Sequence, residues 1–190
     1  PDTVYVAAIG QAFQPNSERG LYKTTDGGKT WENVLFISDK IGIVDFEFSP
    51  ENPDILYAAS WEVDRKPWTI ISGSKAGGIY KSMDEGKSWI KLSEGLPTGN
   101  IGKIDLAVTP ADPNRLYALI EADQGQGGVY VSYDNGGQFK AMSHREELVN
   151  RPFYYCNIYA HPNNADVVYS SANRFMASQD AGKTWEIKST

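Results

Sequence analysis

One twelve-residue pattern decides the fold of this chain, because it occurs four times. The copies are GLYKTTDGGKTW (20–31), GIYKSMDEGKSW (78–89), GVYVSYDNGGQF (128–139) and RFMASQDAGKTW (174–185). Their central aspartates, Asp26, Asp84, Asp134 and Asp180, follow one another at intervals of 58, 50 and 46 residues. Such intervals match the length of a four-stranded blade of a β-propeller.

A second series runs in step with the first and consists of a turn rich in Pro, Asn and Asp followed by a short strand with one Tyr. It occurs as PDTVYVAA (1–8), SPENPDILYAAS (49–60), TPADPNRLYALI (109–120) and AHPNNADVVYSS (160–171). Another short apolar segment precedes the last three, at 43–48, 101–108 and 154–159. Each full unit therefore predicts four strands, A to D, with the Pro-rich turn between A and B and the aspartate pattern between C and D.

These patterns predict an all-β fold, a β-propeller of four-stranded antiparallel blades. About four blades are present, at 1–37, 41–93, 100–142 and 153–190, and the first lacks its inner strand A. Alone, such an arc exposes an unpaired strand edge and two apolar blade faces. We therefore expect an incomplete part of a larger ring, whose remaining blades would be its partners. A head-to-tail pair of copies closing an eight-bladed ring is an alternative that the missing strand disfavours.

Composition excludes several classes of function. The 190 residues carry 18 Lys and Arg against 24 Asp and Glu, a net charge of -6, which argues against a nucleic-acid partner. No apolar run approaches the length of about 20 residues that spans a bilayer. The single cysteine, Cys156, allows no disulfide within the chain. No nucleotide-binding or metal motif occurs, so we expect no cofactor and no metal.

The pattern S/T-x-D-x-G-x-x-W resembles the Asp-box, or bacterial neuraminidase repeat, of sialidases, sortilin-type receptor domains and two-propeller xyloglucanases. The segments around it, such as ERGLYKTTDGGKTWENVLFISD (18–39) and RPFYYCNIYAHPNNADVVY (151–169), resemble bacterial propeller proteins described as sortilin-like or as glycosyl hydrolases. This resemblance implies an Asp-box propeller of six or more blades, an extracytoplasmic or secreted location, and Asp-boxes on the face opposite the ligand site. Sialidase chemistry also needs an arginine triad, but no local motif places those roles on Arg65, Arg145 and Arg151.

The Asp-box residues have a structural explanation. In a tight hairpin turn the aspartate accepts backbone N–H groups, the glycine two residues later adopts a positive φ, and the aromatic ring covers the turn. We expect a looser turn in the third copy, which has Gly137 and Gln138 in place of Lys and Thr or Ser. A structural rather than catalytic role is therefore predicted for Asp26, Gly28, Trp31, Asp84, Gly86, Trp89, Asp134, Gly136, Phe139, Asp180, Gly182 and Trp185.

Candidate ligand-binding residues lie in the connections of the other face, where loop lengths vary. The longest B–C insertion, between Ser60 and Gly77, contributes Trp61, Glu62, Asp64, Arg65 and Trp68. The D–A connection before the fourth blade contributes Arg145, Glu146, Arg151, Tyr154 and Tyr155, the last two leading with Cys156 into a channel-lining strand. The structural alternative is that Trp61 ends strand B and that Trp68 packs the loop onto a neighbouring blade.

We therefore predict a non-enzymatic propeller that binds a peptide, protein or glycan through its B–C and D–A loops. The alternative is a glycoside hydrolase, which needs two carboxyl groups roughly 5 to 10 Å apart. Its candidate pairs join Glu62 or Asp64 with Glu146 or Glu147, or use Asp45 or Asp105. A nucleophilic Cys156 assisted by His144 or His161 is disfavoured, because cysteine is more often a small buried hydrophobe.

Overall fold

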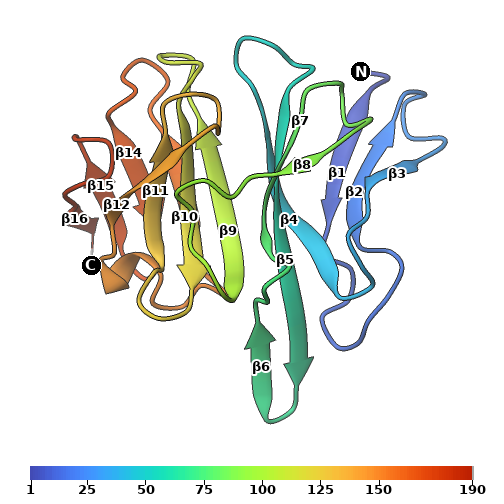
Figure 1. The fold of residues 1–190 in the computed structure, drawn as a ribbon, viewed down its shortest axis with the longest axis horizontal. Coiled ribbons are helices and arrows are strands. Elements are labelled where there is room, and N and C mark those ends of the chain that lie inside the picture. The colour runs from blue at the N-terminus through green and yellow to red at the C-terminus, as the bar shows by residue number, and fades with distance from the viewer. Residues whose placement is uncertain (190) are drawn as a thin grey trace.

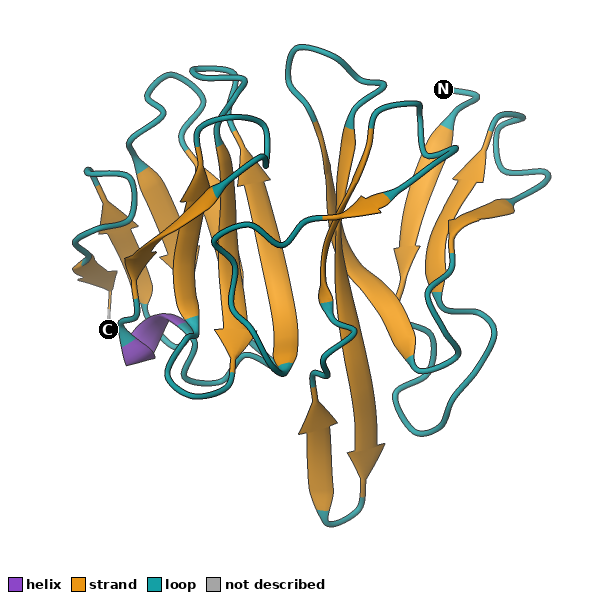
Figure 2. Cartoon of the chain, viewed as in Figure 1, coloured by secondary structure: helices purple, strands orange, loops and turns teal. Residues whose placement is uncertain are grey.

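The structure is a computed structural model that describes residues 1–189. Strands make up nearly all of its regular structure, and the one helix in these residues is the single 3-10 turn η1 (Glu146–Leu148) (Figure 2). Short segments rich in Val, Ile and Tyr, separated by Gly, Pro and Asn turns, favour this outcome. The predicted all-β fold is confirmed.

Sixteen strands of residues 1–189 form four antiparallel sheets, and fifteen of them make up blades 1 to 4, which follow one another along the chain (Figure 1). Blade 1 consists of β1 (Val4–Ala8), β2 (Gly20–Thr24) and β3 (Glu32–Leu35). Blade 2 consists of β4 (Ile41–Phe48), β5 (Leu56–Lys66), β7 (Gly78–Ser82) and β8 (Ile90–Lys91). Blade 3 consists of β9 (Ile101–Val108), β10 (Leu116–Ala122), β11 (Gly128–Ser132) and β12 (Phe139–Ser143). Blade 4 consists of β13 (Asn157–Ala160), β14 (Val168–Ser171), β15 (Phe175–Ser178) and β16 (Glu186–Ser189).

The blades form an open arc. Blade 1 and blade 4 lie at opposite ends of the molecule in Figure 1, and no strand pairing joins them in residues 1–189. Blade 1 has three strands, and the edge of β1 that an inner strand covers in the other blades is free within these residues. Both features agree with the predicted partial propeller whose first blade lacks strand A.

The longest insertion is a β-hairpin rather than a loop. Strand β5 continues to Lys66 and pairs with the additional strand β6 (Thr69–Ser72), so that the hairpin projects below blade 2 (Figure 1). The alternative in which Trp61 ends strand B is therefore wrong. Trp68, at the hairpin tip, is 82% exposed, so the alternative that it packs onto a neighbouring blade is also wrong.

The inner strand of blade 4 starts later than predicted. Strand β13 begins at Asn157, whereas Tyr154 and Tyr155 belong to a turn in which both backbone N–H groups bond to the Arg151 carbonyl. The expectation that these tyrosines line the channel from a strand is wrong. The turn instead places their rings at the surface, next to the start of the hairpin.

Three apolar cores lie between successive blades. Leu21 packs with Ile43 and Ala58 between blades 1 and 2. Tyr57 and Leu116 lie in the core between blades 2 and 3, and a third core joins blades 3 and 4. Because each core is shared, every blade depends on its neighbours for the burial of its apolar faces.

The Asp-box turns have the predicted structural role. In the first copy, Thr24 Oγ1 donates to Asp26 Oδ1 at 2.7 Å and accepts the N–H of Gly28 at 3.0 Å, while Asp26 accepts the Thr30 N–H at 2.9 Å. Gly28 and its three counterparts have φ between 86° and 88°. The residue before each of them also has a positive φ, which the sequence did not reveal, since Glu85, Asn135 and Ala181 occupy three of these positions.

The third Asp-box keeps most of this network. Ser132 Oγ donates to Asp134 Oδ1 at 2.6 Å, and the Gln138 N–H reaches the same oxygen at 2.9 Å. What it lacks is the hydroxyl bond to the second aspartate oxygen that Thr30 makes in the first copy. It also lacks the indole N–H bond to a glycine carbonyl that Trp31, Trp89 and Trp185 make in the other copies, because Phe139 has no donor, so the expectation of a looser turn holds for two hydrogen bonds.

The two repeated turn series are joined by a bond that the sequence did not predict. In each blade the A–B turn offers a carbonyl to the backbone N–H of the residue after the Asp-box aspartate. The four donor and acceptor pairs, at 2.8–2.9 Å, are Gly27 to Asp2, Glu85 to Asp54, Asn135 to Asn114, and Ala181 to Asp166. This bond explains why both series recur at the same interval.

Candidate functional site

The connection from blade 3 to blade 4 builds the most distinctive surface outside the Asp-box face. After η1 the chain turns at 151–155, where it carries Phe153 across to the base of the hairpin. The ring of Phe153 meets the indole of Trp61 edge-on, with the ring centroids 5.3 Å apart. A segment leading into blade 4 is thereby packed against blade 2.

Aromatic rings continue outward from this contact. Phe153 and Tyr154 lie edge to face at 5.0 Å, and Tyr155 follows at 6.2 Å from Tyr154. Trp61 is buried at the inner end of this row of rings, and its Nε1 donates to Ser72 Oγ at 2.9 Å. Trp61 thus has no exposed ring face for a ligand, whereas the two tyrosines are about half exposed.

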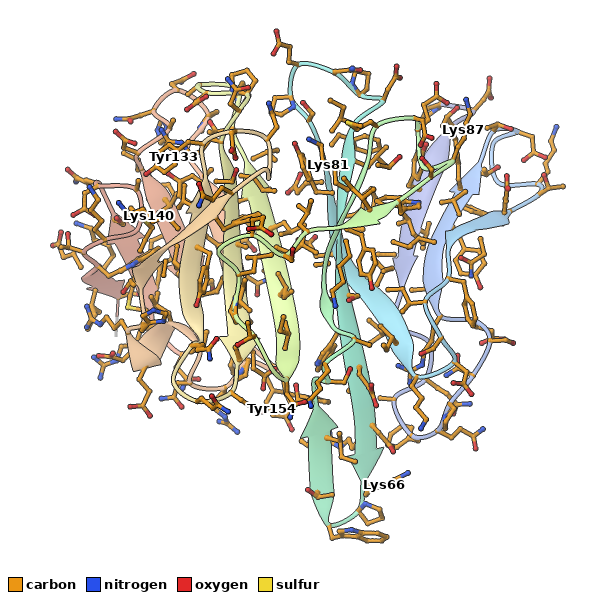
Figure 3. All side chains as sticks on the ribbon, in the orientation of Figure 1. Lys66, Lys81, Lys87, Tyr133, Lys140 and Tyr154 are labelled. Atoms are coloured by element: carbon orange, nitrogen blue, oxygen red, sulfur yellow. The ribbon has the colours of Figure 1, made fainter. Side chains whose placement is uncertain are left out.

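Three cations stand over these rings. The Arg65 guanidinium lies 5.7 Å from the centre of Phe153, and that of Arg151 lies 5.4 Å from the centre of Tyr154. The Lys103 ammonium lies 5.9 Å from Trp61. We call the surface formed by Arg65, Lys103, Arg151, Phe153, Tyr154 and Tyr155 the aromatic–cation cluster. Figure 3 shows Tyr154 at the end of the molecule opposite Lys87 of an Asp-box turn.

Arg65 and Arg151 lack acidic partners, whereas Lys103 lies close enough to Asp45 and Asp105 for its charge to oppose the rise in their pKa values. Within residues 1–189, none of the side chains of Arg65, Lys103 and Arg151 forms an ion pair or a hydrogen bond. By contrast, Arg115 is paired with Asp112 and Asp166 at 3.2 and 3.0 Å. Cation–π contact leaves the N–H groups of a guanidinium available to an incoming acceptor.

The remaining candidates of the insertion lie elsewhere. Glu62 and Asp64 alternate with Arg65 along β5 and face a shallow pocket that Arg19 and Lys40 also line. Asp64 forms an ion pair with Lys66, with Oδ2 and Nζ 2.9 Å apart. The exposed Trp68 lines a second hollow at the hairpin tip, together with Phe13 and Arg65. The structure therefore separates Glu62 and Asp64 from Arg65, whereas Trp68 and Arg65 line the same hollow.

The first half of the D–A connection is also apart from the cluster. Arg145 forms a bidentate pair with Glu147 at 3.0 and 3.1 Å and donates to the Trp185 carbonyl at 2.7 Å. Arg145 thus ties this connection to the Asp-box strand of blade 4. Glu146 begins η1, and no hydrogen bond or ion pair within residues 1–189 links it or Glu147 to Glu62 or Asp64.

Carboxylates do gather on the inner strands. Asp45 Oδ2 accepts the N–H of Leu106 at 2.7 Å, and Asp105 Oδ2 accepts the N–H of Ile158 at 2.7 Å. Each aspartate thus bonds to the inner strand of the next blade. Burial first, and the Asp45 charge second, raise the pKa of Asp105 to about 7.

Glu47 belongs to the same inner surface, two residues after Asp45. Burial, followed by the charges of Asp45 and Asp105, raises its pKa to about 7. No side-chain partner of Glu47 appears in the described residues. These three partly buried groups form an acidic cluster, but two of them are engaged in holding neighbouring blades.

The candidate nucleophile is inaccessible. Cys156 is fully buried, and burial raises the pKa of its thiol far above the ordinary value. His144 bonds to the Gly127 carbonyl through Nδ1 at 3.0 Å, and His161 accepts the Asn163 N–H in an A–B turn. A Cys–His catalytic pair is therefore absent from the described part of the chain.

Two members of the cluster were missed by sequence reasoning. Phe153 lies within the D–A connection but was not singled out, because an isolated Phe carries no pairing signal. Lys103 sits on an inner strand, and only its register opposite the start of the hairpin places it near Trp61. Arg65, Arg151, Tyr154 and Tyr155 were predicted and do come together.

Neither a metal site nor a membrane-spanning helix is found within residues 1–189. No group of three or more His, Cys, Asp or Glu side chains is arranged to hold a metal ion. No helix in this range has the length and apolar character required for crossing a bilayer.

Comparisons with known proteins agree with the fold. The family model of the BNR/Asp-box repeat matches residues 22–33. The "Vacuolar protein sorting/targeting protein 10" of Colletotrichum graminicola is 30% identical over 105 residues, which is 55% of this chain and 6% of that protein. This chain therefore spans only a small part of the curated relative.

Three solved structures resemble this chain over 78–97% of its length. The GH74 enzyme of Niastella koreensis matches over 97% of this chain and 28% of its own, with a TM-score of 0.68 and 18% identity. The GH74 xyloglucanase of Xanthomonas campestris matches over 89% of this chain and 26% of its own, with a TM-score of 0.64 and 15% identity. YCF48 bound to D1 peptide gives a TM-score of 0.52 at 15% identity over 78% of this chain and 39% of its own.

At these identities the structural matches establish the fold alone. The four Asp-box turns, the blade topology and the matched repeat together identify the chain as a four-blade arc of an Asp-box β-propeller.

Proposed function

We propose that the protein is a non-enzymatic binding propeller that holds an acidic peptide segment on the aromatic–cation cluster. The observation that carries this proposal is the gathering of three cations over aromatic rings, with the Arg65 and Arg151 guanidinium groups free of ion pairs in the described residues, in a chain whose net charge is -6. Guanidinium groups bind carboxylates in bidentate geometry, and exposed tyrosine rings accept apolar side chains. An extended peptide with Asp or Glu side chains would supply carboxylates to the guanidinium groups and apolar contacts to the tyrosine rings.

A peptide suits the surface better than a neutral glycan. A neutral sugar would stack the C–H face of its ring on the tyrosines but would leave Arg65 and Arg151 without a counter-charge. Among the proteins of the same fold, YCF48 has been solved bound to the D1 peptide. By resemblance to Asp-box propellers, we also propose an extracytoplasmic or secreted location.

Fluorescence anisotropy of a labelled oligoglutamate peptide tests the binding. We expect saturable binding of oligoglutamate and none of an oligoglutamine peptide with the same label. The double variant Arg65→Gln, Arg151→Gln should weaken binding at least tenfold, because each lost charge-assisted hydrogen bond contributes about 1.5–3 kcal/mol. Lys87→Gln removes one charge on the Asp-box face and should bind as the unmodified protein does.

Two results would reject the peptide proposal. One is equal binding of oligoglutamine, which would mean that the cations do not take part. The other is an equal loss of affinity in Lys87→Gln, which would mean that only overall charge matters. Competition by neutral xyloglucan oligosaccharides at the same site would favour a glycan ligand instead.

A second candidate function rests on the acidic cluster of Asp45, Glu47 and Asp105. Glu47, with its pKa raised to about 7, has the property of a proton donor at neutral pH, and the GH74 enzymes share the fold. Asp45 and Asp105 hold backbone groups of the next blade, which disfavours a catalytic role for them. Release of reducing ends from xyloglucan that Glu47→Gln abolishes would establish the hydrolase; we expect no release.

A further inference from the structure

One face of the hairpin formed by β5 and β6 connects the aromatic–cation cluster with the hairpin tip. Side chains alternate along each strand, and residues paired directly across the two strands lie on the same face. Val63 pairs with Ser72, and Arg65 pairs with Ile70. Trp61 belongs to this face as well, because its Nε1 donates to Ser72 Oγ at 2.9 Å. From the core outward, the face therefore carries first Trp61, then Val63 and Ser72, and then Arg65 and Ile70.

At its outer end this face opens into a hollow of about 540 Å³. Phe13, Trp68 and Ile70 supply its large apolar side chains, and all three are exposed. We call the space between Arg65 and these three side chains the tip hollow. Arg65 lines the hollow, and its guanidinium also lies 5.7 Å from the centre of the Phe153 ring. One cation thus belongs both to the tip hollow and to the aromatic–cation cluster.

The tip hollow lies among segments that are already packed together. The hairpin belongs to blade 2, and blades 1 and 3 are present on its two sides (Figure 1). The backbone N–H of Arg65 donates to the Ala12 carbonyl at 2.6 Å, which holds the loop that carries Phe13 beside the hairpin. At the hairpin base, Phe153 packs on Trp61. The exposure of this hollow therefore does not depend on an absent neighbouring blade.

The charges around the tip hollow suit an acidic ligand. Within residues 1–189, the charged side chains that line it are Arg65 and Lys66, and none of its lining side chains is acidic. Lys66 is paired with Asp64 at 2.9 Å, which leaves Arg65 to meet a carboxylate. Glu62 and Asp64 line the pocket on the opposite face of the hairpin and would repel an acidic peptide there. Figure 3 shows Lys66 at the same end of the molecule as Tyr154 of the cluster.

We propose that the tip hollow holds a large apolar side chain of the acidic peptide that the aromatic–cation cluster binds. This inference rests on the proposed function and specifies its ligand as a peptide with an aromatic or large aliphatic residue close to an Asp or Glu. The carboxylate pairs with Arg65, while the apolar side chain covers Trp68 and Ile70 and removes their surfaces from water. In an extended peptide, side chains two positions apart lie on the same side at roughly 7 Å, so one short segment reaches both.

Two labelled peptides that differ at a single position test this inference. Both are oligoglutamates of equal length and equal charge, one with a central Phe and the other with a central Ser. In the Phe peptide, a glutamate lies two positions from the aromatic ring on either side. Fluorescence anisotropy should give a dissociation constant about tenfold lower for the Phe peptide than for the Ser peptide, because the phenylalanine side chain loses contact with water in the hollow.

Substitutions in the hollow should remove this preference. In Trp68→Ser the dissociation constants of the two peptides should become nearly equal, and Phe13→Ser should change their ratio in the same direction. Both side chains are exposed, and circular dichroism with thermal unfolding checks that each variant folds. Met83→Ser, at an exposed apolar position in the Asp-box turn of blade 2, is the matched control and should keep the tenfold ratio. The double variant Arg65→Gln, Arg151→Gln should weaken the binding of both peptides.

The outcomes separate this inference from the proposed function. If the Ser peptide binds and the Phe peptide binds no more tightly, the apolar anchor is rejected while peptide binding by the cluster is retained. If neither peptide binds, both proposals are rejected. A preference for Phe that persists in Trp68→Ser, or that Met83→Ser also loses, would overturn the placement in the tip hollow. Binding of neutral xyloglucan oligosaccharides or of phosphatidylcholine vesicles that Trp68→Ser abolishes would instead assign the hollow to a sugar or to a lipid surface.

Discussion

At the residue scale, short hydroxyl and carboxylate side chains determine the turns of this protein. Ser132 and Ser178, which are almost completely buried, each donate to the Asp-box aspartate and accept a glycine N–H. Hydrogen bonds to its charged form hold the pKa of Asp26 at about 2, with the Thr30 backbone the first cause. The inner-strand carboxylates behave oppositely, because burial outweighs the backbone bonds that they accept.

This contrast predicts a pH dependence of stability. The pKa of Asp105 is raised from 3.8 to about 7 in the folded state, so the native protein holds the proton more tightly than the unfolded chain does. The stabilisation is complete below pH 3.8 and is lost as the pH rises through 7. We expect the free energy of unfolding to fall over this range, and Asp105→Asn to reduce the fall without abolishing it, because Glu47 remains.

Urea denaturation at several pH values measures this effect. Below pH 3.8 the Asp-box carboxylates act in the other direction, because the pKa of Asp84 is also about 2 and its stabilisation disappears as it is protonated. The free energies of unfolding of the unmodified chain and of Asp105→Asn should therefore be compared above pH 4. An unchanged pH profile in Asp105→Asn would show that this carboxyl group does not titrate as described.

At the element scale, the hairpin and the B–C loop of blade 1 form one unit. Arg19 is buried and donates to the carbonyls of Lys40 at 2.7 Å, Gln11 at 2.8 Å and Val63 at 3.2 Å. The backbone N–H of Arg65 donates to the Ala12 carbonyl at 2.6 Å. A long strand extension that would otherwise stand free is thus fixed to its neighbouring loop, which positions Arg65 for the cluster.

Replacement of Arg19 should loosen this unit. Arg19→Met keeps the apolar volume but leaves three carbonyls without a donor, which should cost about 3 kcal/mol in thermal or urea unfolding. Hydrogen exchange should increase at 60–72 and at 10–19 more than in blade 4. Glu18→Gln, at the preceding exposed position, is the control and should leave both quantities unchanged; a similar loss there would remove the role assigned to Arg19.

At the scale of the whole molecule, stability comes from the junctions between blades. Each one combines an apolar core with a tyrosine bond to the next blade and, in blades 2 and 3, an aspartate bond along the inner strands. A tyrosine position therefore matters only when a blade follows it. Tyr57 and Tyr169 occupy equivalent positions, and only Tyr57 has a following blade in this arc.

Two matched substitutions test this dependence. Tyr57→Phe removes a hydroxyl that donates to Asn135 and should reduce the free energy of unfolding by about 0.5–1.5 kcal/mol. Tyr169→Phe should have almost no effect in dilute solution. Equal losses in the two variants would contradict the dependence of the tyrosine bond on a following blade.

The repeats alone determined the all-β propeller fold, the order of its blades, the missing inner strand and the structural role of the Asp-boxes. These properties depend on short-range chemistry: an aspartate, a hydroxyl and a glycine at fixed spacing form the turn wherever they occur. The same reasoning identified Arg65, Arg151, Tyr154 and Tyr155, since it located the variable connections of one face.

Only the tertiary structure decided which of those candidates meet. The hairpin alternates its side chains between two faces, so Arg65 joins the cluster while Glu62 and Asp64 turn away, and neither Phe153 nor Lys103 carries a local signal. The contact between Phe153 and Trp61 joins residues far apart in sequence. Long-range contacts of this kind depend on how blades pack together, and no repeat encodes them because each of these residues occurs once.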